Sequence, residues 1–131
     1  MKKCLLSNLT CDKKENLYLC KTEIPCFMDK RQILERIKQL AIAVLPQGSS
    51  LWLFGSRARG DESQSSDWDL LILLDKSKIT SEDYDLAYFF RELGWDLNAT
   101  ISPHVYSKKQ WEGWSFLPFY KNVEQDKIVL V

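Results

Sequence analysis

The sequence has no excess charge of either sign, because 18 lysine and arginine residues are matched by 18 aspartate and glutamate residues. A balanced chain has no general electrostatic attraction to nucleic acid or to an anionic membrane surface. No apolar run approaches the roughly 20 residues that a membrane-spanning helix needs. Only Leu5 and Leu6 follow the opening Met-Lys-Lys before polar residues, so no signal-peptide core forms. These absences favour a cytoplasmic protein with neither a membrane partner nor strong signs of a nucleic-acid partner.

Metal-binding and redox-active residues are also scarce. His104 is the only histidine, and no C-x-x-C pair occurs among the four cysteines, which are Cys4, Cys11, Cys20 and Cys26. A structural zinc site needs four such ligands, arranged in closely spaced pairs. The sequence therefore argues against a zinc site, and reduced thiols fit a cytoplasmic setting.

The 131 residues suffice for a single domain with one hydrophobic core. Residues 1–27 contain all the cysteines and show little periodicity, whereas clear patterns begin after Met28 and Asp29, a good helix N-cap. We therefore predict an N-terminal extension, 1–27, that is loosely attached, followed by one domain, 28–131. Two alternatives for the extension are an arm that packs normally and an upstream mis-start, with Met28 as the initiator.

Hydrophobic spacing outlines the elements of the domain, with helical periodicity in some segments and continuous apolar runs in others. The predicted elements are helix 30–45, strands 51–54 and 68–74, a helix between a Thr80–Asp83 capping box and Gly94, a strand from about Asp96 to Tyr106, a short helix capped by Ser107 and Gln110, helix 116–125 and strand 128–131. This order predicts an α/β (α+β) fold: a small mixed β-sheet with helices packed mainly on one face. The other face is left for the chemistry.

The chain is organised around residues 51–74, LWLFGSRARGDESQSSDWDLLILL. A Gly-Ser step after the first strand, at Gly55 and Ser56, lets backbone N–H groups approach an anion, because glycine has no Cβ. Asp67 and Asp69 open the second strand, and residues two apart on a strand point to the same face. The stretch therefore predicts a phosphate cradle beside a carboxylate pair that can hold a divalent cation.

Two motifs in this stretch carry a family resemblance. G-S-x-A-R-G at 55–60 and S-D-x-D-L at 66–70, separated by a short spacer, resemble the signature of the DNA polymerase β-like nucleotidyltransferase superfamily. In its short length, the chain resembles the minimal nucleotidyltransferase branch of this superfamily. The resemblance implies a nucleotidyltransferase fold for residues from about 29 to 131.

The resemblance also implies roles for the motif residues. Gly55 and Ser56 would bind the β and γ phosphates of ATP or another NTP, and Arg57 or Arg59 would add positive charge at the triphosphate. A structural role for the motif's arginines is the alternative. Asp67 and Asp69 would be the catalytic residues and the ligands of Mg²⁺, which prefers a few carboxylates plus substrate phosphates and water.

One departure concerns the third carboxylate that the resemblance leads us to expect on the following strand. Spacing to the following helix places that position near Ser102 or Thr100, and neither is acidic. Asp96 has the same strand parity but comes several residues early. His104 shares that parity and can accept a proton, although a structural role on the sheet face is the favoured interpretation. Either Asp96, Ser102 or His104 replaces the missing acid, or the site is inactive.

Two functions fit these features. The first is Mg²⁺-dependent transfer of a nucleoside monophosphate from an NTP to a hydroxyl of a protein, small molecule or RNA acceptor. The second is a catalytically weakened nucleotide-binding module that acts as an antitoxin-like partner of a helical HEPN-type protein, with the aromatic segment 111–120 either as its interface or as ordinary core. An antibiotic-modifying enzyme is a weaker alternative, since such enzymes usually carry an added helical domain. Oligomeric state and acceptor are left open by the sequence.

Overall fold

The computed structural model describes residues 28–131. The chain divides into two compact units, Met1–Gln32 and Ile33–Val131. The predicted extension and its cysteines lie outside the described residues. At the end of the first unit, the Gln32 N–H donates to Asp29 Oδ1 at 2.8 Å and the Asp29 N–H donates to Gln32 Oε1 at 2.9 Å. This reciprocal pair is a capping box, so Asp29 caps the first described helix as predicted.

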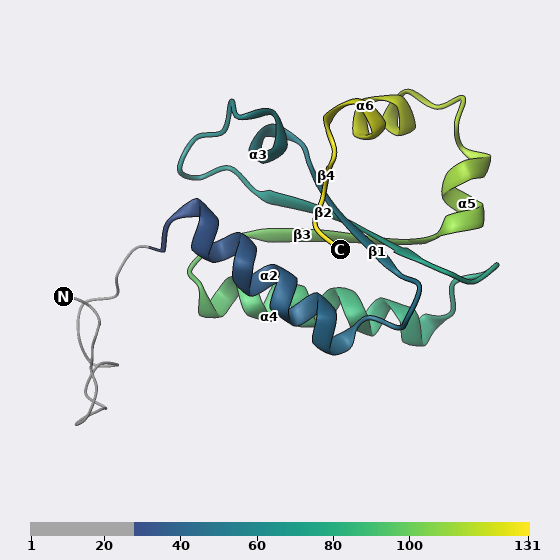
Figure 1. Ribbon diagram of the computed structural model, residues 1–131, viewed down its shortest axis with the longest axis horizontal. Coiled ribbons are helices and arrows are strands. Elements are labelled where there is room, and N and C mark those ends of the chain that lie inside the picture. The colour runs from purple at the N-terminus through teal and green to yellow at the C-terminus, as the bar shows by residue number, and fades with distance from the viewer. Residues whose placement is uncertain (1–27) are drawn as a thin grey trace. The chain divides into compact units, whose positions relative to one another are not determined.

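The second unit is built on a mixed sheet whose described strands follow the order β3-β2-β1-β4 (Figure 1). β2 pairs antiparallel with β1 and parallel with β3, and β1 pairs antiparallel with β4. The elements are α2 (Lys30–Val44), β1 (Ser50–Phe54), α3 (Ser56–Arg59), β2 (Trp68–Leu74), the short 3₁₀ helix η1 (Ser81–Asp83), α4 (Tyr84–Asp96), β3 (Ile101–Ser107), α5 (Lys108–Gly113), α6 (Pro118–Asp126) and β4 (Ile128–Val129). The predicted order of elements and the α/β class are confirmed.

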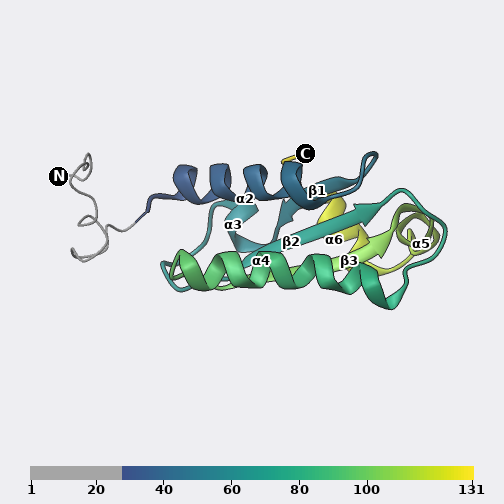
Figure 2. The same ribbon diagram turned by 90° about the horizontal axis from the view of Figure 1, so that it is seen from below.

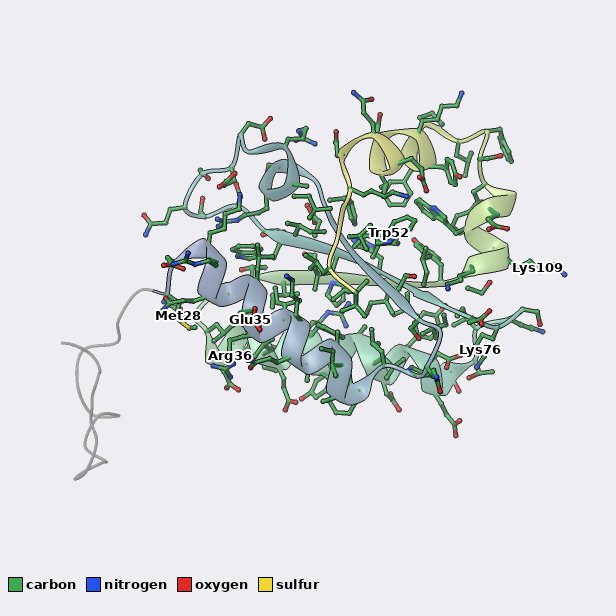
Figure 3. The ribbon with its side chains drawn as sticks, viewed as in Figure 1. Met28, Glu35, Arg36, Trp52, Lys76 and Lys109 are labelled. Carbon is green, nitrogen blue, oxygen red and sulfur yellow. The ribbon has the colours of Figure 1, made fainter. Side chains whose placement is uncertain are left out.

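The two long helices, α2 and α4, lie over the same face of the sheet (Figure 2). The strand residues on this face occupy aligned positions: Leu53 pairs with Leu70, and Leu70 pairs with Pro103. All three are buried. The opposite side of α2 is solvent-facing, with Glu35 and Arg36 exposed (Figure 3). One helical layer therefore closes the main core, as the amphipathic pattern of residues 30–45 predicts.

The other face of the sheet carries a second core beneath α5 and α6. Its buried members are Leu71, Leu73, Trp111 and Val123. Trp111 is 2% exposed, and its Nε1–H donates to Glu124 Oε2 at 3.0 Å. Core packing, one of the two alternatives for segment 111–120, is therefore what the structure shows for this tryptophan.

The end of α4 differs from the prediction. The helix does not stop at Gly94 but continues to Asp96, and β3 begins only at Ile101. Gly94 is a packing residue, because a Cβ there would lie 2.7 Å from the Ala99 carbonyl oxygen. The expectation that Asp96 starts the third strand was wrong, since it belongs to the last turn of a helix.

Among the described helices, none combines the length and the apolar character required to span a membrane.

Candidate functional site

The turn after β1 is fixed by Gly55. Its φ of 78° and ψ of −161° lie in a region essentially reserved for glycine. Its carbonyl accepts hydrogen bonds from the N–H groups of Ala58 and Arg59, both at 3.0 Å, which closes the short helix α3. A Cβ on Gly55 would collide with Asp69 Oδ2. The carboxylate of Asp69 therefore occupies the space that a side chain at position 55 would fill.

The predicted phosphate cradle lies beside that carboxylate. Ser56 is the first residue of α3, and the first N–H groups of a helix have no carbonyl partner within it. Gly55 leads directly into this turn and borders Asp69. The structure therefore places Gly55 next to Asp69, with Ser56 as the residue that follows, and binding of phosphate there stays a prediction.

The acid pair lies at the start of β2. Asp67 immediately precedes the strand and is exposed, whereas Asp69 is partly buried as its second residue. Burial raises the pKa of Asp69 above its usual range, and the negative charge of Asp67 raises that pKa further. The two carboxylates are thus close enough to repel each other, and a cation between them would relieve this repulsion. Two carboxylates with an opening to solvent are a donor set that suits Mg²⁺, which completes its shell with phosphates and water.

Arg57 holds the loop between the two motifs. Its Nη2–H donates to the carbonyls of Gln64 and Ser66, both at 3.1 Å, and its Nε–H donates to Ser66 at 3.3 Å. Its guanidinium also lies 4.4 Å from the ring centroid of Trp68. The structural role that the sequence left as an alternative is therefore present, and contact with nucleotide stays a prediction.

Arg59 joins segments that are distant in the sequence. Its Nη1 lies 3.0 Å from Asp126 Oδ2 at the end of α6, and its Nε lies 3.2 Å from Asp61 Oδ2. Its positive charge also offsets a small part of the increase in the pKa of Asp69. Sequence reasoning did not anticipate this link between α3 and α6, because no local pattern relates residues 67 positions apart.

The third strand contributes Ser102 where an acid was expected. Ser102 is the register partner of Asp69, and its hydroxyl lies 3.3 Å from Asp67 Oδ2, to which it donates. His104 lies two residues after Ser102 on β3, and its ring centroid is 5.6 Å from that of Phe54. Burial lowers the pKa of His104, although the charge of Asp69 opposes this effect. Ser102 is therefore the β3 residue that contacts the acid pair through a hydrogen bond.

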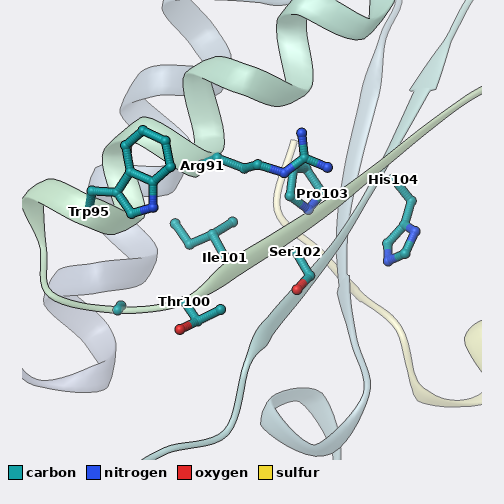
Figure 4. A pocket seen from close by; sticks show the side chains of 8 residues that line it. Arg91, Trp95, Thr100, Ile101, Ser102, Pro103 and His104 are labelled. Carbon is teal, nitrogen blue, oxygen red and sulfur yellow. The ribbon is translucent and has the colours of Figure 1, made fainter.

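A pocket of about 470 Å³ adjoins Ser102. Arg91 and Trp95 of α4 extend over it, and residues 99–104 form the rest of its lining (Figure 4). The Trp95 side chain is well exposed, at 66%. Sequence reasoning missed both residues; their only signal is the i, i+4 spacing at the end of the helix. Among the described residues, no cluster of three or more His, Cys, Asp or Glu side chains could hold a metal ion.

Comparison with known proteins identifies the fold and the family. Two similar solved structures are described as a toxin-antitoxin with AMP-PNP, at 19% identity and a TM-score of 0.53, and the toxin-antitoxin MntA-HpeT carrying two Asp-to-Glu substitutions, at 16% identity and 0.51. Each alignment covers 75% of this chain and 72% of the other chain, and at these identities it shows a shared fold. No curated protein matches the chain. The family model for the nucleotidyltransferase domain matches residues 30–130, and the chain therefore belongs to the nucleotidyltransferase domain family.

Proposed function

We propose that the protein is a divalent-ion-dependent nucleotidyltransferase that uses ATP or another NTP. In the proposed reaction an acceptor hydroxyl oxygen forms a bond to the α-phosphorus, the bond between the α-phosphorus and the bridging oxygen breaks, and pyrophosphate leaves with the hydroxyl proton released to solvent. The observation that carries this proposal is the contact between Gly55 and Asp69. It sets the turn that we propose for phosphate binding directly against the Asp69 carboxylate, so that one small region could hold both a triphosphate and its cation.

Each residue of the site has a proposed task. The N–H groups of the turn at Gly55 and Ser56 bind the β and γ phosphates, and Arg57 adds positive charge while it holds the loop. Asp67 and Asp69 hold Mg²⁺, which supplies charge neutralisation for the triphosphate and the departing pyrophosphate when bound. Partial burial of Asp69 strengthens its interaction with a cation, because charges attract more strongly where the local dielectric is low.

The acceptor would reach the site through the pocket beside Ser102. Arg91, Trp95 and Ser102 all line this pocket, and the Ser102 hydroxyl donates to Asp67. An arginine and an exposed indole can contact an acceptor that combines an anionic group with a flat ring. Protein, small-molecule and RNA acceptors can all supply such groups, so the acceptor class stays open within this proposal.

A second candidate function is that of a nucleotide-binding partner protein. Ser102 supports it, because a hydroxyl occupies the place beside Asp69 where a third carboxylate would raise turnover. Two similar structures are toxin-antitoxin complexes, and the exposed Phe116, 70% accessible, offers contact area near α6. In this alternative the chain binds nucleotide without efficient transfer and acts as the antitoxin-like partner of a helical HEPN-type protein.

Labelled ATP separates the two functions. The protein is incubated with ATP labelled at the α-phosphate, Mg²⁺ and the product of the neighbouring gene. Labelling of the partner supports the transferase if it is lost in Asp67→Asn and persists in Asp85→Asn. The second variant is the matched control, because it removes an exposed carboxylate of α4. A tight complex that stays unlabelled supports the binding module and rejects transfer to this partner.

A further inference from the structure

The carboxylate pair has non-acidic neighbours on both adjoining strands. Asp69 pairs with Phe54 of β1 on one side and with Ser102 of β3 on the other. The phenyl ring cannot bind a cation through oxygen, and Ser102 directs its hydroxyl to Asp67 at 3.3 Å. The acceptor side of the pair therefore offers a neutral hydroxyl in place of a carboxylate.

The other ionisable residues considered for this site either lie outside the sheet or interact with other groups. Asp96 belongs to the last turn of α4 and not to the sheet. Asp61 and Asp126 both form ion pairs with Arg59, at 3.2 and 3.0 Å. His104 lies among aromatic rings, with its ring tilted by 50° to that of Phe54 and the two centroids 5.6 Å apart. Within residues 28–131 the protein thus supplies two carboxylates to this region and no third anionic ligand.

Ligand number then limits how many ions can bind. Two divalent ions about 3.5–4 Å apart repel strongly, and sites that hold both neutralise them with several carboxylates and substrate oxygens. A single Mg²⁺ needs only one or two carboxylates, because substrate phosphates and water complete its octahedral shell. The two carboxylates of this site therefore fit a single Mg²⁺ ion.

We propose that the site binds one divalent ion, shared between Asp67, Asp69 and the nucleotide triphosphate, and that Ser102 excludes a second ion from the acceptor side. This inference rests on the proposed function, because the single ion enters together with the nucleotide. It makes residue 102 the position that sets the ion count. The acceptor hydroxyl is then not bound to a protein-held metal ion, and the Ser102 hydroxyl is the group that lies beside it.

Manganese binding tests the ion count directly. Mn²⁺ is titrated into the full-length protein saturated with α,β-methylene ATP, which cannot transfer its nucleotide, and free Mn²⁺ is measured by electron paramagnetic resonance. One bound ion per protein–nucleotide complex is expected. Two bound ions would overturn this inference while leaving the proposed function intact. Absence of any nucleotide-dependent binding would overturn both.

A matched pair of variants tests the role of residue 102. Ser102→Asp adds a carboxylate beside Asp69 and should raise the count from one ion to two. Ser102→Asn has nearly the same size without the charge and should keep one ion. A count of one in the folded aspartate variant, checked by circular dichroism, would show that residue 102 does not set the number of ions and would overturn the inference.

Discussion

Replacement of Gly55 by alanine tests how the turn after β1 and the acid pair share space. The backbone at φ 78° and ψ −161° is open essentially only to glycine. An added Cβ would also lie 3.2 Å from Asp69 Cγ and collide with Oδ2. Backbone strain of about 1–3 kcal/mol, plus about 0.5–1.5 kcal/mol to move a carboxylate off its rotamer, predicts a total loss of about 1.5–4.5 kcal/mol.

Urea denaturation measures this loss, with Gly60→Ala as the matched control. Gly60 also has positive φ, 88°, but its Cβ would meet nothing within 4 Å. Its alanine variant should therefore lose only about 1–2 kcal/mol, the cost of left-handed backbone. In an Asp69→Ala background the collision disappears, so Gly55→Ala should become milder by about 0.5–1.5 kcal/mol.

Two results would contradict a steric link between Gly55 and Asp69. Equal losses for the alanine variants at positions 55 and 60 would show that Asp69 does not crowd the turn. An undiminished loss in the Asp69→Ala background would show that the cost is backbone strain alone. Either result would remove the steric link on which the proposed site depends.

Three further predictions concern the framework of the site. Arg57→Ala should lower stability by about 1–3 kcal/mol in urea denaturation, because charged hydrogen bonds and a ring contact are lost; Arg57→Lys should not restore it, since lysine lacks the guanidinium fork. Although burial opposes the shift, the Lys and Trp partners of Glu124 leave its pKa below the ordinary 4.5. Its stabilising effect should therefore be present at neutral pH and vanish as pH falls through that lowered pKa, so Glu124→Gln and wild type should differ in melting temperature at pH 7 and converge in acid. Gly94→Ala should lower the free energy of unfolding by about 1–3 kcal/mol, because its Cβ would overpack against the Ala99 carbonyl. Gly113 has open space around it, so Gly113→Ala should be neutral or stabilising. Equal stability of the two variants in thermal melting would contradict this contrast.

The local parts of the site were predictable because each follows from a short-range pattern. The nearly all-apolar run from Trp68 to Leu74, interrupted by Asp69, predicted a buried central strand, and its observed bounds are the same. The two-residue spacing of Asp67 and Asp69 predicted a carboxylate pair at its start, in agreement with the charge coupling between them. Glycine after a strand predicted the unusual turn at Gly55.

The parts that depend on distant contacts were not predictable from spacing. Gly94 was interpreted as a helix stop, whereas its missing side chain admits the Ala99 carbonyl, so the third strand starts later than predicted. The pairing of Arg59 with Asp126 requires α6 to return beside α3, and no local pattern encodes that return. Trp95 on α4 became relevant only because this helix packs along β3.

Calorimetric titration of ATP into the protein, with and without Mg²⁺, tests whether nucleotide binds at the acid pair. Binding should require the ion and should weaken more than about tenfold, or about 1.4 kcal/mol, in Asp69→Asn. Asp85→Asn, on the exposed side of α4, should bind as wild type does. Absence of binding at millimolar ATP with Mg²⁺, or binding that neither the ion nor Asp69 affects, would contradict a nucleotide site at this acid pair.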